Sequence, residues 1–303
     1  MHVLVTGGTG FLGRHLVRVL ERDGMSVVIV NTKTCDLTRQ ENLLSLKDEK
    51  FDRIYHLAAW TKAGDYCLYH KGEQWIVNQQ LNTNVLWFWK EFQPQAELVA
   101  MGTSCAYSPG FPLKEESYMK GDPDPDLYTY TMTKRMLYEG LVALRHQYGL
   151  NYRYLVPSTL YGPEFDPSDT HFVFDLIRKI VAGKENGDPV VLWGDGSQIR
   201  ELIYVEDAVR LIELTAGKIS NDILNVASGA GYSIKEYAQK ICEIVGYDPD
   251  DIQYDTSRYV GVLKKILDTS RIDSLFNFDY TPLETGLRAT IDSYLSDRLK
   301  RLS

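Results

Sequence analysis

A tyrosine and a lysine stand four residues apart in the sequence "YTYTMTK", as Tyr130 and Lys134. The surrounding segment 128–149 has the apolar spacing of a long helix, in which that separation stacks the two side chains on one face. An ammonium ion near a phenol stabilises the phenolate, so Tyr130 could exchange a proton with a substrate oxygen closer to neutral pH. Because such pairs also occur by chance in many helices, this one needs supporting signals.

The sequence "MGTSCAY" places two hydroxyls and a thiol side by side, on Thr103, Ser104 and Cys105. They stand at the end of the apolar run 96–104, which predicts a strand. A cysteine at such a position is usually a small buried hydrophobic residue. Its thiolate could also serve as a base near neutral pH, so both interpretations stay open from these residues alone.

Three glycines, Gly7, Gly10 and Gly13, separate a short apolar run from a segment with helical spacing. A tight turn needs φ > 0, and a pyrophosphate needs close backbone approach at a helix N-terminus, so the pattern predicts a dinucleotide-binding loop. At the end of the next run, Asn31 and Lys33 stand where an acid would select NAD. This favours NADP, while NAD stays open because Lys33 could equally be a surface charge.

Apolar runs alternate with helix-length segments through the first half of the chain. This alternation is typical of a doubly wound parallel sheet, and we predict an α/β fold of the Rossmann type. Beyond about residue 160, short runs mix with helices and predict a smaller C-terminal α+β region that binds substrate. We expect domains over 1–162 and 163–303, with 200–220 returning to the first. The apolar runs are 2–6, 26–30, 51–59, 96–104 and 152–158.

The composition argues against several classes of protein. The 303-residue chain has a net charge of −8, whereas a nucleic-acid-binding protein needs clustered Lys and Arg. No apolar run approaches the length of a membrane span, and the chain enters a strand-like segment at once, so we expect a cytoplasmic protein without a membrane partner. The four cysteines lie far apart, which predicts no metal site: Cys35, Cys67, Cys105 and Cys242.

Successive motifs of the chain match those of a known family in order. The chain resembles the extended short-chain dehydrogenases/reductases, a family of nucleotide-sugar epimerases, dehydratases and reductases. The likeness covers nearly the whole chain and implies a homodimer formed through a four-helix bundle that includes the Tyr130 helix. The matching motifs are "TGGTGFLG" (6–13), "HLAA" (56–59), "GTSCAY" (102–107), "YTMTK" (130–134), "VPSTLYGP" (156–163) and, from 200, "REL.YVEDAV".

The same resemblance assigns roles to individual residues. Thr103 would orient the reacting sugar oxygen with Ser104 beside it, Tyr130 would be the acid, and Lys134 would hold the nicotinamide ribose. The implied cofactor contacts are Gly7, Thr9, Gly10, Phe11, Leu12, Gly13, Asn31, Lys33, Asp36, Leu37, Leu57, Ala58, Ala59, Tyr130, Lys134 and Pro157.

Cys105 distinguishes branches of this family. Dehydratases and decarboxylases carry an acid at or beside this position, whereas the branch that epimerises C3 and C5 and reduces C4 carries a cysteine. That branch pairs the cysteine with a histidine after the "LYGP" loop, which matches His171, and binds the nucleotide diphosphate near positions matching Trp193 and Arg200. Thr9, Thr159 and the segment 58–75 depart from its pattern.

We therefore expect an NADP-dependent enzyme that acts on a nucleotide-diphosphate 4-keto-hexose. Cys105 and His171 would invert C3 and C5 from opposite faces, because the ketone acidifies the neighbouring C–H bonds. Tyr130 would protonate the C4 oxygen as hydride reduces the carbon. A nucleotide-sugar 4-epimerase with tightly bound NAD is the alternative, and a non-catalytic dinucleotide-sensing regulator is a remote one.

Overall fold

The structure is a computed structural model that describes residues 1–61, 69–258 and 260–302. Residues 62–68 of the divergent stretch 58–75, among them Cys67, lie outside the described residues. In the described part of the chain, no helix is both long and apolar enough to cross a bilayer. The same residues contain no cluster of three or more His, Cys, Asp or Glu side chains arranged to hold a metal ion.

Six parallel strands form the large sheet, in the order β2-β1-β3-β4-β5-β9. This arrangement confirms the predicted doubly wound parallel sheet. Three strands are shorter than the apolar runs that predicted them: β4 ends before the "GTS" residues, β3 covers only part of 51–59, and β5 ends one residue before its run does. The strands are β1 (His2–Thr6), β2 (Ser26–Val30), β3 (Arg53–His56), β4 (Glu97–Met101), β5 (Tyr152–Pro157) and β9 (Asp222–Val226).

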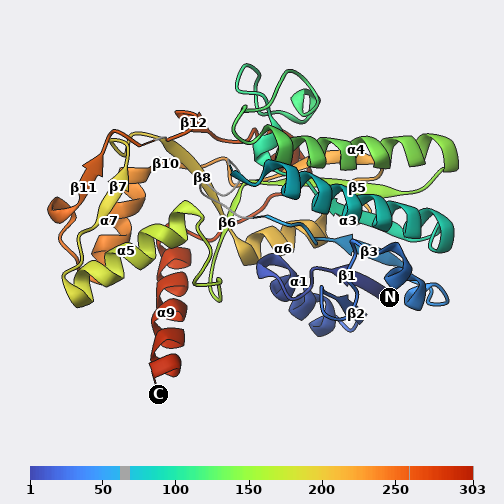
Figure 1. Ribbon diagram of the computed structural model, residues 1–303, viewed down its shortest axis with the longest axis horizontal. Helices are drawn as coiled ribbons and strands as arrows, with labels where there is room; N and C mark the ends of the chain where they lie inside the picture. The colour runs from blue at the N-terminus through green and yellow to red at the C-terminus, as the bar shows by residue number, and fades with distance from the viewer. Residues whose placement is uncertain (62–68, 259, 303) are drawn as a thin grey trace.

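Helices cover both faces of this sheet, because alternate strand residues point to opposite sides. Leu4 of β1 belongs to the hydrophobic cluster beneath α3 and α4, whereas Val3 and Val5 belong to the cluster beneath α1 and α6. Figure 1 shows α3 and α4 side by side along one face and α1 and α6 on the other. The helices are α1 (Phe11–Arg22), α3 (Lys71–Phe92), α4 (Tyr128–Tyr148), α6 (Val205–Leu214) and α8 (Ser270–Leu275), the last lying against β9.

The smaller α+β region has its own core, formed mainly by α5, α7 and α9 with short strands. Strand β8 pairs with β6, β10 and β12, and β7 pairs with β11. The helices are α5 (Phe172–Asn186), α7 (Ile234–Val245) and α9 (Leu283–Leu302), which projects away from the body in Figure 1. The strands are β6 (Thr159–Tyr161), β7 (Val191–Trp193), β8 (Ile199–Tyr204), β10 (Gly231–Ser233), β11 (Gln253–Asp255) and β12 (Lys264–Lys265).

The segment 200–220, which we expected to return to the large sheet, is divided between the two regions. Its first residues belong to β8 in the smaller sheet, and only α6 packs against α1. The return continues beyond it, because β9 pairs with β5 and α8 packs on β9. The chain therefore passes between the two regions more than once.

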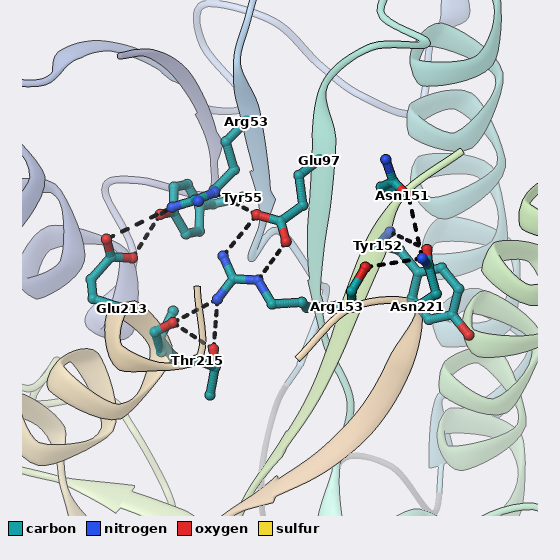
Figure 2. Close-up of polar contacts among 11 residues, drawn as sticks. Arg53, Tyr55, Glu97, Asn151, Tyr152, Arg153, Glu213, Thr215 and Asn221 are labelled. Atoms are coloured by element: carbon teal, nitrogen blue, oxygen red, sulfur yellow. Dashed lines mark hydrogen bonds and ion pairs between the residues drawn. The ribbon is translucent and has the colours of Figure 1, made fainter. Parts of the chain in front are cut away.

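The amino end of the large sheet holds a buried network of charged side chains (Figure 2). Glu97, at the start of β4, accepts hydrogen bonds from Arg53 Nε at 2.7 Å and from Arg153 Nε at 2.8 Å. The fully buried Arg153 also donates to Thr215 Oγ1 at 2.6 Å, just beyond α6. Opposite charges and hydrogen bonds are satisfied within the network, so it ties β3, β4, β5 and the α6 terminus together.

Candidate active site

The glycine loop joins β1 to α1 at the carboxyl end of the sheet, where open α/β sheets bind ligands. Gly7 has φ +68°, and a Cβ there would lie 2.8 Å from Ala58 N. A Cβ at Gly13 would lie 2.2 Å from Gly7 O. Gly10 is the N-cap of α1 and has no side chain to cap its first amides, including those of Phe11 and Leu12. The loop thus fits a pyrophosphate, which needs backbone amides and close approach.

The residues after β3 are fixed by hydrogen bonds around His56. Thr6 Oγ1 contacts His56 Nδ1 at 2.9 Å and accepts from Ala58 N at 3.2 Å. His56 Nε2 contacts Asn82 Oδ1 at 3.0 Å, and burial lowers the pKa of the imidazole to about 4. His56 is therefore a neutral structural residue that sets the path of 57–59 along the loop. Leu57, Ala58 and Ala59 are half-buried there, as is Pro157 at the end of β5.

The turn after β2 carries the residues expected to discriminate between NAD and NADP. Asn31 Oδ1 accepts from the backbone amides of Lys33 at 2.9 Å and Thr34 at 3.2 Å, so this side chain builds the turn itself. Asp36 Oδ1 similarly accepts from Thr38 N and Oγ1, and Leu37 is buried. Lys33 is exposed, so its ammonium is the charge that this turn presents to solvent.

Lys134 reaches from α4 to the end of β4, where its Nζ donates to Met101 O at 2.9 Å. Only 4% of the residue is exposed, and this burial lowers the pKa of the ammonium to about 8. Tyr130 is half-buried one helical turn earlier on the same helix, as the spacing predicts. The two side chains and the residues after Met101 can therefore serve one site.

A short 3-10 turn, η2 (Ser104–Ala106), follows the strand and presents the hydroxyl–thiol group. Thr103 caps this turn by accepting a hydrogen bond from Cys105 N at 3.3 Å, and Ser104 is buried. Cys105 is half-buried, with its Sγ 3.3 Å from Lys265 Nζ. Burial raises the pKa of the thiol, but the Lys265 charge and hydrogen bonds from Thr103 and Lys265 outweigh it, and the net pKa is lowered.

Lys265 was not anticipated from the sequence. It lies on the two-residue strand β12, and 160 positions separate it from Cys105. No local pattern marks such a residue, because the contact depends wholly on how the smaller sheet meets the large one.

His171 is the N-cap of α5, and its side chain is 45% exposed. Its Nδ1 lies 2.5 Å from Asp169 Oδ1, which also accepts from His171 N at 2.8 Å. Burial raises the pKa of Asp169, yet the hydrogen bond and charge of His171 bring its net pKa below the usual value. Asp169 was also not anticipated, although an acid two residues before the histidine is a local signal. Within the described residues, the hydrogen bonds of His171 go to Asp169 and that of the Cys105 thiol to Lys265, and none joins His171 to Cys105.

Trp193 and Arg200 lie in the smaller region. Trp193, at the end of β7, is 45% exposed, and the Arg258 guanidinium lies 5.4 Å from its ring centroid. The exposure argues against a core role for the tryptophan. Arg200 donates to Ile199 O and to Val260 O, both at 2.9 Å, so backbone carbonyls hold its guanidinium.

Comparisons with known proteins agree with this geometry. The chain is 31% identical to the "Probable GDP-L-fucose synthase 1" of Oryza sativa subsp. japonica over 97% of this chain and 92% of the relative. A GDP-L-fucose synthetase from Naegleria fowleri bound to NADP superimposes with a TM-score of 0.88 at 22% identity, covering 98% and 93% of the chains. The UDP-glucose 4-epimerase of Thermotoga maritima, solved with UDP-glucose, gives 0.87 at 24% identity, covering 98% and 100%.

The family predicted from the motifs is confirmed at the level of the whole chain. Residues 3–227 match the profile described as "NAD dependent epimerase/dehydratase family", which spans the glycine loop, the Thr103–Cys105 turn, the Tyr130 helix and β9. The relatives are nucleotide-sugar enzymes and resemble this chain along nearly its full length. The protein therefore belongs to the NAD dependent epimerase/dehydratase family.

Proposed function

We propose that this protein is an NADP-dependent epimerase/reductase that acts on a nucleotide-diphosphate 4-keto-hexose. The observation that carries the proposal is the half-buried Cys105 thiol, which contacts the Lys265 ammonium. Cys105 lies in the turn that Thr103 caps. A 4-epimerase or dehydratase needs no activated thiol there, whereas inversion beside a ketone needs a base. The likeness to GDP-L-fucose synthases supports the same reaction class.

The cofactor would be held by the glycine loop and the turn after β2. Both parts fit a dinucleotide: Gly7, Gly10 and Gly13 place no Cβ against a pyrophosphate, and the exposed Lys33 suits a 2′-phosphate. The NADP named in the Naegleria structure supports this choice. When bound, NADPH supplies the hydride that reduces C4. Thr9, which replaces a basic residue of similar synthases, leaves Lys33 as the expected phosphate contact.

For the reduction, Tyr130 would donate a proton to the C4 oxygen while Thr103 orients that oxygen. Lys134 supports the donation, because an ammonium close to a phenol favours the phenolate left behind. With a pKa of about 8, Lys134 is mostly protonated at neutral pH and can keep this role. Its bond to Met101 O fixes the ammonium at the strand end beside the turn that carries Thr103.

For the epimerisation, the Cys105 thiolate would take the proton from the carbon beside the ketone. The C–H bond breaks, an S–H bond forms, and the electron pair moves onto the C4 oxygen as an enolate. His171 would return a proton to the opposite face. Because Asp169 binds Nδ1, Nε2 is the ring nitrogen left to donate it. Ser104, Trp193 and Arg200 would bind the sugar and the nucleotide diphosphate.

A homodimer is part of this proposal. Helices α3 and α4 expose large apolar side chains, namely Trp75, Ile76 and Met136. Exposed apolar surface on paired helices favours a helical bundle with a second copy. Sedimentation analysis would measure the oligomeric state. The cytoplasmic location expected from the sequence stays a prediction.

The function is tested by turnover in D₂O with NADPH and a panel of nucleotide-diphosphate 4-keto-hexoses. We expect loss of absorbance at 340 nm together with deuterium at C3 and C5, measured by mass spectrometry. Cys105→Ala should abolish the exchange and leave NADPH binding intact. If the purified protein instead retains NAD and interconverts C4 epimers without net oxidation, the 4-epimerase alternative holds.

A further inference from the structure

We propose that Lys265 is a positioning residue for the epimerisation, which holds the Cys105 side chain in place as a thiolate. The inference rests on the proposed function, because it gives that function its base in the required protonation state. The Lys265 ammonium donates to the Cys105 thiol. It would act through Cys105 and would not itself exchange protons with the sugar.

The contact between the two side chains is direct. Lys265 Nζ lies 3.3 Å from Cys105 Sγ, within hydrogen-bonding distance for sulfur. A cation at this separation stabilises the anionic form of a thiol. Thr103 acts in the same direction through its hydrogen bond, whereas the negative charge of Asp124 acts against it. Lys265 is thus the cation that faces this sulfur in the described part of the chain.

Strand β12 determines which of two adjacent lysines faces the thiol. Lys264 pairs with Ile199 and Lys265 with Arg200 of β8. Because successive residues of a strand point to opposite sides, only one lysine can face Cys105. Lys265 is half-buried against the sulfur, and Lys264 is exposed. Two lysines on one short strand therefore have different environments, which provides a matched control.

Two buried side chains fix the segment that carries Lys265. Glu201 of β8 is almost fully buried and accepts from Leu267 N at 2.9 Å and Gly229 N at 2.6 Å. The fully buried Asn225 donates to Asp268 O at 3.0 Å and accepts from Tyr107 Oη at 2.6 Å.

Asn225 therefore links both members of the pair through the backbone. Tyr107 follows Cys105 by two residues, and Asp268 follows Lys265 by three. One buried amide thus ties the turn with the thiol to the segment with the ammonium. Buried, fully satisfied polar contacts of this kind hold a single geometry. A lysine that only shielded the surface would need no such anchoring.

The test is the pH dependence of iodoacetamide alkylation at Cys105, followed by peptide mass spectrometry so that each cysteine is resolved. Only the thiolate reacts, so the midpoint of the profile reports ionisation, and altered access changes the rate without moving the midpoint. The variants are Lys265→Met, Lys265→Arg and the control Lys264→Met. Cys35 and Cys242 are buried and serve as slow internal references.

We expect the wild-type midpoint to lie below that of an unperturbed thiol, about 8.5. Lys265→Met should raise it by about one pH unit, which lowers the thiolate fraction at neutral pH about tenfold. Lys264→Met should leave the midpoint unchanged, and Lys265→Arg should restore most of the effect. An unchanged midpoint in Lys265→Met overturns the proposal. A wild-type midpoint at or above 8.5 also overturns the proposal. This measurement is made on the wild-type protein, so it does not depend on whether a variant folds.

Deuterium exchange separates failure of this inference from failure of the proposed function. If Cys105→Ala still exchanges C3 and C5 protons, the epimerase assignment is wrong, whatever the alkylation profile shows. If exchange requires Cys105 but the Lys265→Met midpoint equals that of the wild type, only the role of Lys265 is wrong. When both hold, Lys265→Met should slow exchange more at pH 6.5 than at pH 9, because alkaline pH restores the thiolate.

Discussion

The two ends of the large sheet both bury charged side chains, but they compensate the charges differently. At the amino end, Glu97 lies between the guanidinium groups of Arg53 and Arg153 (Figure 2). At the carboxyl end, the equally buried Lys134 donates to the neutral carbonyl of Met101, and no carboxylate pairs with it among the described residues. The same fold therefore contains one satisfied charge network and one charge left without a counter-ion.

This difference separates stability from function. In a paired, hydrogen-bonded network the opposite charges largely cancel, so the electric field acting on a nearby ligand is small. An unpaired buried ammonium can instead stabilise negative charge that forms on a neighbouring group. Keeping such an ammonium lowers stability, since burial disfavours the charged form. We therefore expect substitutions at the amino end to change the free energy of unfolding and those at the carboxyl end to change catalysis. Each prediction below tests one side of that comparison.

The largest catalytic effect is expected for Tyr130→Phe. Removing the proton donor should lower the rate of NADPH-dependent reduction by about 10²–10⁴-fold, the usual contribution of a positioned general acid. Thermal unfolding should be unchanged, because Tyr130 is only half-buried. Tyr128→Phe is the matched control, since Tyr128 is exposed two residues earlier and should keep full activity. Equal activity of the two variants would contradict the assignment.

At the amino end, Arg153→Met should destabilise the fold and spare the chemistry. The substitution removes hydrogen bonds to Glu97 and Thr215 and leaves a carboxylate with one guanidinium partner. Breaking a buried pair in this way costs about 3–5 kcal/mol in the free energy of unfolding, measurable by urea titration. Below the unfolding transition, kcat should stay within about twofold of the wild type. A large loss of kcat without a loss of stability would contradict the assignment of the amino-end network to stability alone.

Lys134→Met should give the opposite result, with less activity and more stability. Burial lowers the pKa of Lys134 to about 8, so at pH 7 the folded protein holds a proton less favourably than the unfolded chain. Replacing the ammonium by an apolar side chain should raise the free energy of unfolding at pH 7 by about 3 kcal/mol. Urea titration at pH 7 measures it, and a destabilised Lys134→Met would show that the charge is compensated after all.

The same residue predicts a pH dependence with a definite sign. Between about pH 8 and the model-peptide value of 10.5, the unfolded chain keeps the Lys134 proton that the folded chain has released. Stability from this group therefore rises with pH across that window. The difference in unfolding free energy between Lys134→Met and wild type should shrink from pH 7 to pH 10. Taking this difference cancels the titration of the other groups, which both proteins share. If this difference stayed constant with pH, the conclusion that Lys134 is a buried ammonium with a lowered pKa would be wrong.

The parts of this site that a sequence can predict are those built from neighbours in the chain. The glycine loop follows from a strand, a turn and a helix in immediate succession, and the Tyr130–Lys134 pair follows from helical spacing. The end of β4 was predicted three residues too late, because Gly102 and Thr103 leave the strand before η2. The strand propensities of these residues do not predict that Thr103 caps the following turn.

The parts that could not be predicted are contacts between distant segments. Cys105 meets Lys265 across 160 positions, on a strand too short to have a periodic pattern. The Arg53–Glu97–Arg153 network joins three strand starts whose residues look like ordinary surface charges in sequence. In both cases the charge partner is set by the order of strands in the sheet, which residue spacing does not encode.

The smallest effect is expected at the exposed part of the carboxyl edge, where Lys33 follows β2. An exposed ammonium contributes modestly to phosphate binding, because water and salt screen it. Lys33→Met should weaken NADPH use about three- to tenfold in kcat/KM and leave NADH use unchanged, so the preference between them narrows. The effect should diminish as salt rises from 0.05 to about 0.5 M. Lys47→Met, an exposed lysine distant from β2 in sequence, is the control and should change neither. If Lys33→Met lowered kcat/KM for both cofactors equally, Lys33 would not select the 2′-phosphate of NADPH.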